Sequence, residues 1–136
     1  MKIVDSLVRN SLALVLAAVC LAALAAGCAV RPAAYLVPPG EVGVAIEASN
    51  FEFKPNLIQA RAGDALVLKV KNVAGMGHNL TVLDPQGKSL ASVDLPAGQT
   101  TEIPLPPLGA GTYPFHCDKP LHPSFGMKGE IRVGTP

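Results

Sequence analysis

The chain has 136 residues and a formal net charge of +1, with thirteen Pro, three Cys, four Phe, two Tyr and no Trp. This length favours a single domain, and the near-neutral charge without a basic cluster gives no support for nucleic-acid binding. Because aromatic residues are few, the core must consist mainly of Val, Leu and Ile.

Residues 1–27 have the composition of an export signal. Lys2 and Arg9 precede an uncharged run rich in Ala and Leu that ends in small residues, which is the order found in secretory signal peptides. The run is about 17 residues long, at the lower limit for a membrane-spanning helix, so a spanning helix is the alternative. We expect a signal peptide and an exported protein.

The end of this segment, LAAGC at residues 24–28, resembles the lipobox of bacterial lipoproteins. Ala25 stands where Leu is usual, so ordinary cleavage stays open. The resemblance implies that Cys28 carries lipid and anchors the protein on the periplasmic or cell-surface side of a membrane. Residues 28–40 contain several Pro and few charges, and we interpret them as a tether. The tether would reach roughly 40 Å when fully extended.

The three cysteines then have different fates. Cys20 is removed with the signal and Cys28 is modified, so Cys117 has no partner for a disulfide. Exported thiols tend to be oxidised. A single thiol that persists there is buried or bound to something, which favours a metal ligand.

From Glu41 onward, short segments alternate apolar and polar residues with a period of two, which predicts half-buried strands. Turn residues separate them every 8 to 12 positions. The expected strands are residues 41–48, 57–61, 65–72, 78–84, 89–95, 99–105, 112–117 and 128–133. We predict an all-β fold for residues 41–136, an antiparallel Greek-key β-sandwich of seven or eight strands. Immunoglobulin-like binding modules share this architecture, so the fold alone does not identify a function.

Cys117, His122 and Met127 follow one another near the C-terminus, with four residues between each pair. Side chains alternate along a strand, so Cys117 should share the inner face of its strand with Phe115. His116 should then point to the opposite face. The loop that returns to the last strand brings His122 and Met127 to the same end of the sandwich.

His78 is the histidine that can complete this group, because it opens a strand whose end should lie at the same pole. Two imidazoles, one thiolate and a weak axial thioether are the ligands of a blue-copper electron-transfer site. Thiolate and thioether sulfur stabilise Cu(I), and imidazole suits both oxidation states. We therefore predict one type 1 copper ion held by His78, Cys117, His122 and Met127.

Other kinds of site fit these residues less well. Structural zinc takes four strong ligands and would leave Met127 without a role. A binuclear copper centre needs a second Cys in the loop, where the sequence has Leu121. A catalytic Cys–His pair lacks an evident orienting acid beside His122. A structural sandwich without metal is the remaining alternative.

Residues 41–134 resemble the cupredoxins, a family of small copper proteins. The resemblance rests on F-x-F-x-P at residues 51–55 followed by Gly-Asp, on Gly-His-Asn at residues 77–79, and on C-x4-H-x4-M from Cys117. It implies that Asn79 ties the His78 strand to the ligand loop, with Asp118 as its partner. It also implies that the Gly77 carbonyl approaches copper from the side opposite Met127.

The resulting hypothesis is an electron carrier that is not an enzyme. Apolar residues near His122 should expose the edge of its ring in a hydrophobic patch that docks redox proteins such as a cytochrome, an oxidase or a reductase. The residues of this patch are Leu121, Pro123, Phe125 and Met76. The alternative is a copper-storage or delivery protein that hands copper to an oxidase or exporter, which Met76 near His78 slightly favours.

Overall fold

The structure, a computed structural model, describes residues 33–134. The predicted signal peptide, Cys28 and the first residues of the predicted tether lie outside these residues. Residues 33–134 contain no helix that could span a membrane, and their regular elements are all strands.

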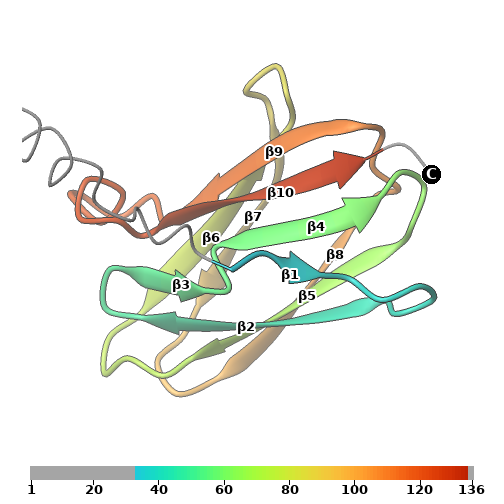
Figure 1. Cartoon of the computed structure of the whole chain (residues 1–136). Helices are drawn as coiled ribbons and strands as arrows, with labels where there is room; N and C mark the ends of the chain where they lie inside the picture. Colours follow the sequence, from blue (N-terminus) through green and yellow to red (C-terminus); the bar gives the residue numbers. More distant parts are fainter. Residues whose placement is uncertain (1–32, 135–136) are drawn as a thin grey trace, which may run out of the picture. The chain divides into compact units, whose positions relative to one another are not determined.

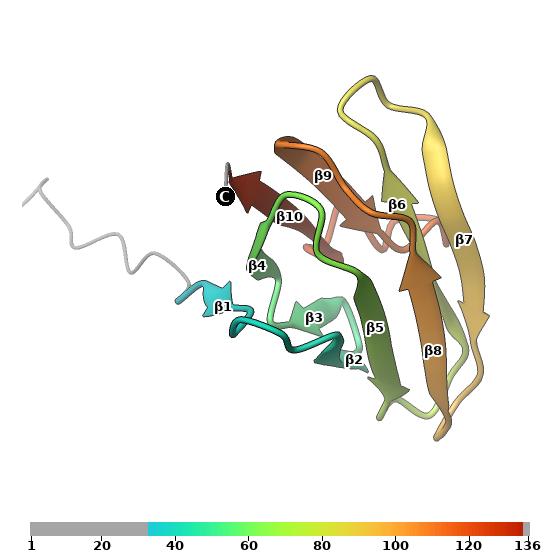
Figure 2. The same cartoon turned by 90° about the vertical axis from the view of Figure 1, so that its right-hand side faces the viewer.

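Ten strands form two sheets that pack as a sandwich (Figures 1 and 2). The larger sheet has six strands in the order β1-β4-β10-β9-β6-β7, and the smaller has four in the order β3-β2-β5-β8. The strands are β1 (Tyr35–Leu36), β2 (Gly43–Ser49), β3 (Glu52–Lys54), β4 (Leu57–Arg61), β5 (Leu66–Asn72), β6 (His78–Leu83), β7 (Ser89–Leu95), β8 (Thr100–Leu105), β9 (Gly111–His116) and β10 (Lys128–Gly134). The predicted all-β sandwich is confirmed.

The alternation of side chains puts the apolar residues between the two sheets. On β5, Leu66, Leu68 and Val70 are buried while Lys69 and Lys71 face water. On β9, Tyr113 and Phe115 are buried, and Cys117 directly after this strand is buried as well. Burying one apolar face of each sheet in this way is the main source of the fold's stability.

The pairing of the strands differs from the predicted antiparallel arrangement. β4 pairs in parallel with both β1 and β10, and β2 pairs in parallel with β5. Period-two alternation identifies strands and their buried faces but says nothing about the direction of a neighbour. The sheets are therefore mixed, because the chain crosses between layers after β3 and after β4.

Part of the predicted tether belongs to the larger sheet. Tyr35 and Leu36 pair with Ile58 and Gln59 of β4, and Val37 is buried in the core, with its N–H donated to the Gln59 carbonyl at 2.9 Å. The expectation that residues 28–40 form a free segment is thus wrong for these three. The two Pro residues at 38–39 masked this short edge strand in the sequence.

Candidate metal centre

Three connections gather at one end of the sandwich: the β2–β3 turn, the β5–β6 loop (residues 73–77) and the β9–β10 loop (residues 117–127). They lie together at the left of Figure 1, where β6 begins and β9 ends. β6 and β9 are antiparallel neighbours, with Thr81 opposite His116. This register brings His78, at the start of β6, alongside the residues that follow β9.

His78, Cys117 and His122 form a compact, buried group. The two Nδ1 atoms of His78 and His122 are 3.2 Å apart, and Cys117 Sγ lies 3.5 Å from His122 Nδ1. The three ligand atoms all lie within 4.8 Å of one another. Residues up to 44 positions apart in sequence thus present two imidazole nitrogens and one sulfur to a single point.

Met127 lies directly against two members of this group through its backbone. Its N–H donates to the His122 carbonyl at 3.0 Å, and its carbonyl accepts the Cys117 N–H at 3.1 Å. Its side chain is fully buried. The structure therefore brings Met127 to the same end of the core as Cys117 and His122.

The spacing of the group fits a metal ion. With bonds of about 2.0–2.1 Å to nitrogen and 2.3 Å to sulfur, neighbouring ligand atoms in trigonal or tetrahedral sites are roughly 3.3–3.8 Å apart. The nitrogen–nitrogen and sulfur–nitrogen separations observed here are close to this range. Thiolate and thioether sulfur with imidazole is a donor set that suits copper.

Burial keeps His78 in the neutral form that binds metals. Desolvation lowers its pKa below the ordinary value, and the neighbouring His122 and Lys119 lower it further. Its Nε2 is buried and has no hydrogen-bond partner in the structure. Nδ1 lies 3.2 Å from His122 Nδ1, on the side of the other proposed ligands, and is the nitrogen placed for coordination.

This shift predicts how the metal-free protein responds to acid. The unfolded chain binds a proton at His78 below about pH 6.5, whereas the folded chain, whose His78 pKa is lowered, binds it only at lower pH. Stability should therefore be complete above about pH 6.5 and fall as the pH drops from there through the lowered folded pKa, with a slope of up to about 1.4 kcal/mol per pH unit from this residue. Denaturant unfolding at a series of pH values measures the slope. His78→Gln should flatten it, and an unchanged slope in that variant would assign the effect to another group.

The ligand loop is closed by its own backbone hydrogen bonds. His122 N–H donates to Lys119 O at 3.1 Å, Phe125 N–H to Leu121 O at 3.0 Å, and Gly126 N–H to Pro123 O at 3.2 Å. Pro123 also restricts the conformation of His122, the residue before it. The loop is therefore built to hold His122 in place without help from a ligand.

The family of the chain is decided by its sequence and agrees with this geometry. A model of the cupredoxin-like domain matches residues 12–133, which is most of the chain. The chain belongs to the cupredoxin family. The family and the site together point to copper.

Solved structures resemble this cupredoxin in fold. Reduced auracyanin from the photosynthetic bacterium Roseiflexus castenholzii is 20% identical with a TM-score of 0.61, over 69% of this chain and 98% of that chain. Auracyanin A, a blue copper protein of Chloroflexus aurantiacus, is 20% identical with a TM-score of 0.57, over 68% and 99%. The metal-binding domain of CopA, a Cu(I)-exporting P-type ATPase of Streptococcus pneumoniae, is 14% identical with a TM-score of 0.57, over 76% and 98%. No curated protein matches this cupredoxin in sequence.

Polar residues on the outer side of the cupredoxin sheet fix the chain on either side of Cys117. Asn79 and Asp118 exchange two hydrogen bonds, from Asn79 Nδ2 to Asp118 Oδ2 at 2.8 Å and from the Asp118 N–H to Asn79 Oδ1 at 2.6 Å. Asp118 also accepts from Thr81 Oγ1 at 2.6 Å and pairs with His116 Nε2 at 2.7 Å. These partners lower the Asp118 pKa, the Thr81 hydrogen bond most, then the hydrogen bond from Asn79 and the contact with His116. His116 points away from the metal centre, as strand alternation predicts.

A second asparagine, Asn72, holds the loop that precedes His78. Its Nδ2 donates to Met76 O at 2.9 Å and to Leu95 O at 2.8 Å, and its Oδ1 accepts the Ala74 N–H at 3.0 Å. Gly77 follows in this loop and is half-buried next to His78. The sequence placed Asn72 only at the end of a strand and gave no sign of this role.

The surroundings of His122 differ from the expectation that its ring edge is exposed. His122 is only 8% exposed, because the ring of Phe51 lies against it in an edge arrangement, with centroids 5.1 Å apart. Phe51 was not among the predicted site residues, since it belongs to a turn 71 positions away. Its only signal in the sequence was its place as the first residue of the F-x-F-x-P motif at residues 51–55. Leu121 and Phe125 on the same loop are exposed, as is Met76 on the loop before His78.

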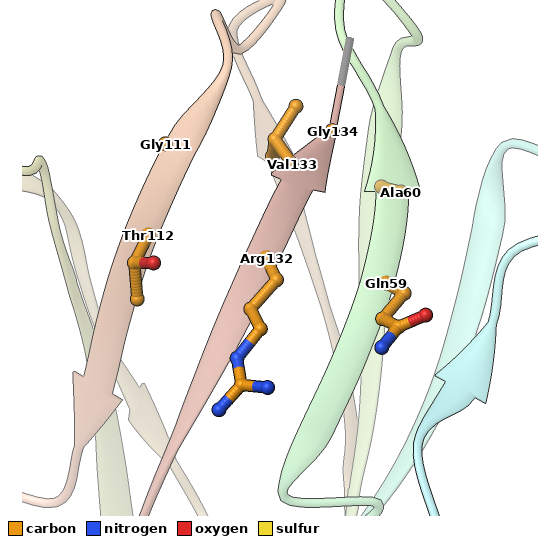
Figure 3. Close-up of a pocket in the computed structure, with 7 residues that line it drawn as sticks. All are labelled: Gln59, Ala60, Gly111, Thr112, Arg132, Val133 and Gly134. Atoms are coloured by element: carbon orange, nitrogen blue, oxygen red, sulfur yellow. The ribbon is translucent and has the colours of Figure 1, made fainter. Parts of the chain in front are cut away.

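A hollow of about 370 Å³ on the larger sheet is separate from this centre. Arg132, Gln59 and Thr112 extend across β10, β4 and β9 at its surface (Figure 3). It lies at the beginning of β9, whereas Cys117 follows the end of that strand, roughly 20 Å away at about 3.3 Å per residue. The hollow therefore takes no part in the metal site.

Proposed function

We propose that this cupredoxin is a mononuclear blue, type 1, copper protein that carries electrons between redox partners. The observation that carries the proposal is the buried group of His78, Cys117 and His122, with Met127 beside it. We further propose that residues 1–27 direct its export and that lipid on Cys28 tethers it to a membrane. It catalyses no reaction of its own.

Each residue of the centre would have a distinct role. Bound copper supplies the one-electron couple between Cu(II) and Cu(I). His78 and His122 offer nitrogen ligands that suit both states, Cys117 a thiolate, and Met127 a weak axial thioether. The strands and the hydrogen-bonded loop keep these groups in one geometry, so little rearrangement accompanies electron transfer. The Gly77 carbonyl, on the loop immediately before His78, would offer a further weak oxygen ligand.

Addition of Cu(II) to the purified protein tests the proposal. We expect one equivalent to bind and to produce an intense visible band from thiolate-to-copper charge transfer, and we expect ascorbate to bleach it reversibly. A colourless complex, or binding of several equivalents, would contradict a type 1 site. Zinc is the main metal alternative. A zinc site would be colourless both with and without ascorbate, because Zn²⁺ undergoes no redox change.

Partners are proposed to dock on the apolar surface around His122. Leu121 is the most exposed large apolar residue there, at 65%, and Leu121→Lys would place a charge in the middle of a desolvated contact. We expect electron self-exchange between copies of the copper protein, measured by NMR line broadening, to slow about five- to tenfold, the effect of losing one interface anchor. Val42→Lys adds the same charge to an exposed apolar position outside the loops of this surface. Equal slowing in both variants would argue against a docking surface at His122.

Copper delivery is the second candidate function. Met76 exposes a soft thioether on the loop immediately before His78, where an incoming acceptor would meet it. The similarity in fold to a domain of a Cu(I)-exporting ATPase is compatible with this role. A delivery protein should give up Cu(I) to a chelator such as bicinchoninate within seconds, and Met76→Leu should slow that transfer. A carrier should retain its copper in the same experiment, with or without Met76.

A further inference from the structure

Two bulky residues in the structure have the left-handed backbone conformation that favours glycine, and both adjoin His122. Within residues 33–134 they are the non-glycine residues with positive φ: Phe51 at 65° and Leu121 at 69°. Leu121 directly precedes His122, and Phe51 lies against its ring. Strained backbone of this kind persists only where surrounding contacts hold it, and it concentrates at functional sites.

The strain in the β2–β3 turn is not required by the turn itself. Asn50 and Phe51 form a two-residue connection between Ser49 and Glu52. The residue with positive φ in such a turn is usually Gly or Asn, because a large side chain is crowded there. The sequence places Phe at this position, so the side chain must have a use that outweighs an easier turn.

The ring of Phe51 contacts two residues of the ligand loop, and its backbone passes close to a third. Its ring meets His122 at 5.1 Å with an interplanar angle of 79°, and meets Phe125 at 5.1 Å with an angle of 60°. Its carbonyl oxygen lies 3.5 Å from where a Cβ on Gly126 would stand. Edge-to-face contacts of this kind are attractive and fix the relative orientation of two rings.

The ring of His122 is consequently held between two other rings. His78 lies on one side, with centroids 5.1 Å apart, and Phe51 on another. Although Leu121 and Phe125 on the same loop are largely exposed, His122 is buried. Phe51 is itself 40% exposed, so its ring contacts His122 on one side and meets water on another.

We propose that Phe51 is a positioning residue, which braces His122 in its metal-binding orientation from outside the loop and closes the centre to water and small anions. The brace acts on the metal-free chain, so copper meets a preformed ligand. The part of this proposal that concerns bound copper rests on the proposed function. The part that concerns His122 itself does not.

The test compares variants that separate the ring from the backbone. Phe51→Gly removes the ring and relieves the strained φ, Phe51→Leu keeps an apolar side chain without an aromatic edge, and Phe51→Tyr keeps the ring. Leu36→Ala shortens an exposed apolar residue on β1 and serves as the control. Denaturant unfolding confirms that each metal-free variant is folded.

In the metal-free protein, we expect the His122 ring signals in NMR to show greater mobility in Phe51→Gly and Phe51→Leu than in wild type, Phe51→Tyr and Leu36→Ala. In the copper-loaded protein, we expect the same two variants to lose Cu(I) to bicinchoninate about two- to tenfold faster, the range for one aromatic contact. Azide should then perturb their Cu(II) spectra but not that of the wild type.

Unchanged His122 mobility in both Phe51→Gly and Phe51→Leu would overturn the brace, as would an equal effect of Leu36→Ala. If the wild type binds no copper, the proposed function fails, and the NMR comparison on the metal-free protein still decides whether Phe51 holds His122. If copper binds with an intense band but neither release nor azide response changes, the centre stands and the role of Phe51 is disproved.

Discussion

Cys117→Ser is expected to abolish the intense visible band of the copper-loaded protein and to weaken copper retention by more than about 100-fold. Replacing groups that merely support a ligand already costs about 10- to 100-fold in metal affinity, and Cys117 supplies the ligand atom itself. A serine hydroxyl is not ionised at neutral pH and lacks the soft sulfur that copper prefers. Visible and EPR spectra before and after Cu(II) addition measure both effects.

The structure supplies controls for this result. The backbone N–H of Cys117 donates to Met127 O, and Ser keeps this hydrogen bond, so the loop should retain its path. His116→Ala alters the preceding residue, which faces Asp118 on the outer side of the sheet, and should keep the band. A band of equal strength in Cys117→Ser, or its loss in His116→Ala, would place the sulfur ligand or the metal elsewhere.

The strands of the sandwich could be predicted because one face of each is buried. The period-two pattern located the eight longer strands to within two residues at most boundaries, for example residues 57–61 for β4 and 89–95 for β7. The pattern missed β1, β3 and the parallel pairs. Strands of two or three residues are too short to display a period, and the direction of a neighbour depends on crossovers between layers that leave no local mark.

The group of His78, Cys117 and His122 could be predicted for a similar reason. Each residue sits at a strand end or on a short loop, so their positions follow once the strands are placed. The contact of the Phe51 ring with His122 could not be predicted in this way. Phe51 reaches the loop from the β2–β3 turn, and only the packing of one sheet on the other brings that turn within reach.

Gly129→Ala is expected to destabilise the whole domain. A Cβ on Gly129 would stand well inside contact distance of both Asn56 O and Phe115 Cζ, so the backbone of β10 or the Phe115 ring must move. Phe115 cannot yield freely, because it is buried and packs edge-on against Phe53 with centroids 5.6 Å apart. Overpacking of this kind costs about 1–3 kcal/mol or more.

Thermal unfolding of the metal-free protein measures this cost. For a domain of this size we expect the Tm to fall by about 4–8 °C for each kcal/mol lost. Gly134→Ala changes the same strand at a position where nothing lies within 4 Å of the added Cβ, and should leave the Tm nearly unchanged. Equal and small shifts in the two variants would show that the core near Phe115 can relax.

The same substitution links the core to the metal centre. Gly129 lies opposite Phe115 in the β9–β10 pair, and Phe115 is two residues before Cys117 on the same face. If Phe115 moves to admit the new methyl group, the thiol at the end of β9 moves with it. We therefore expect any Gly129→Ala protein that folds to show a shifted or weakened copper band, whereas Gly134→Ala keeps the wild-type spectrum. A normal band in a destabilised Gly129→Ala protein would mean that β10 moves instead of β9.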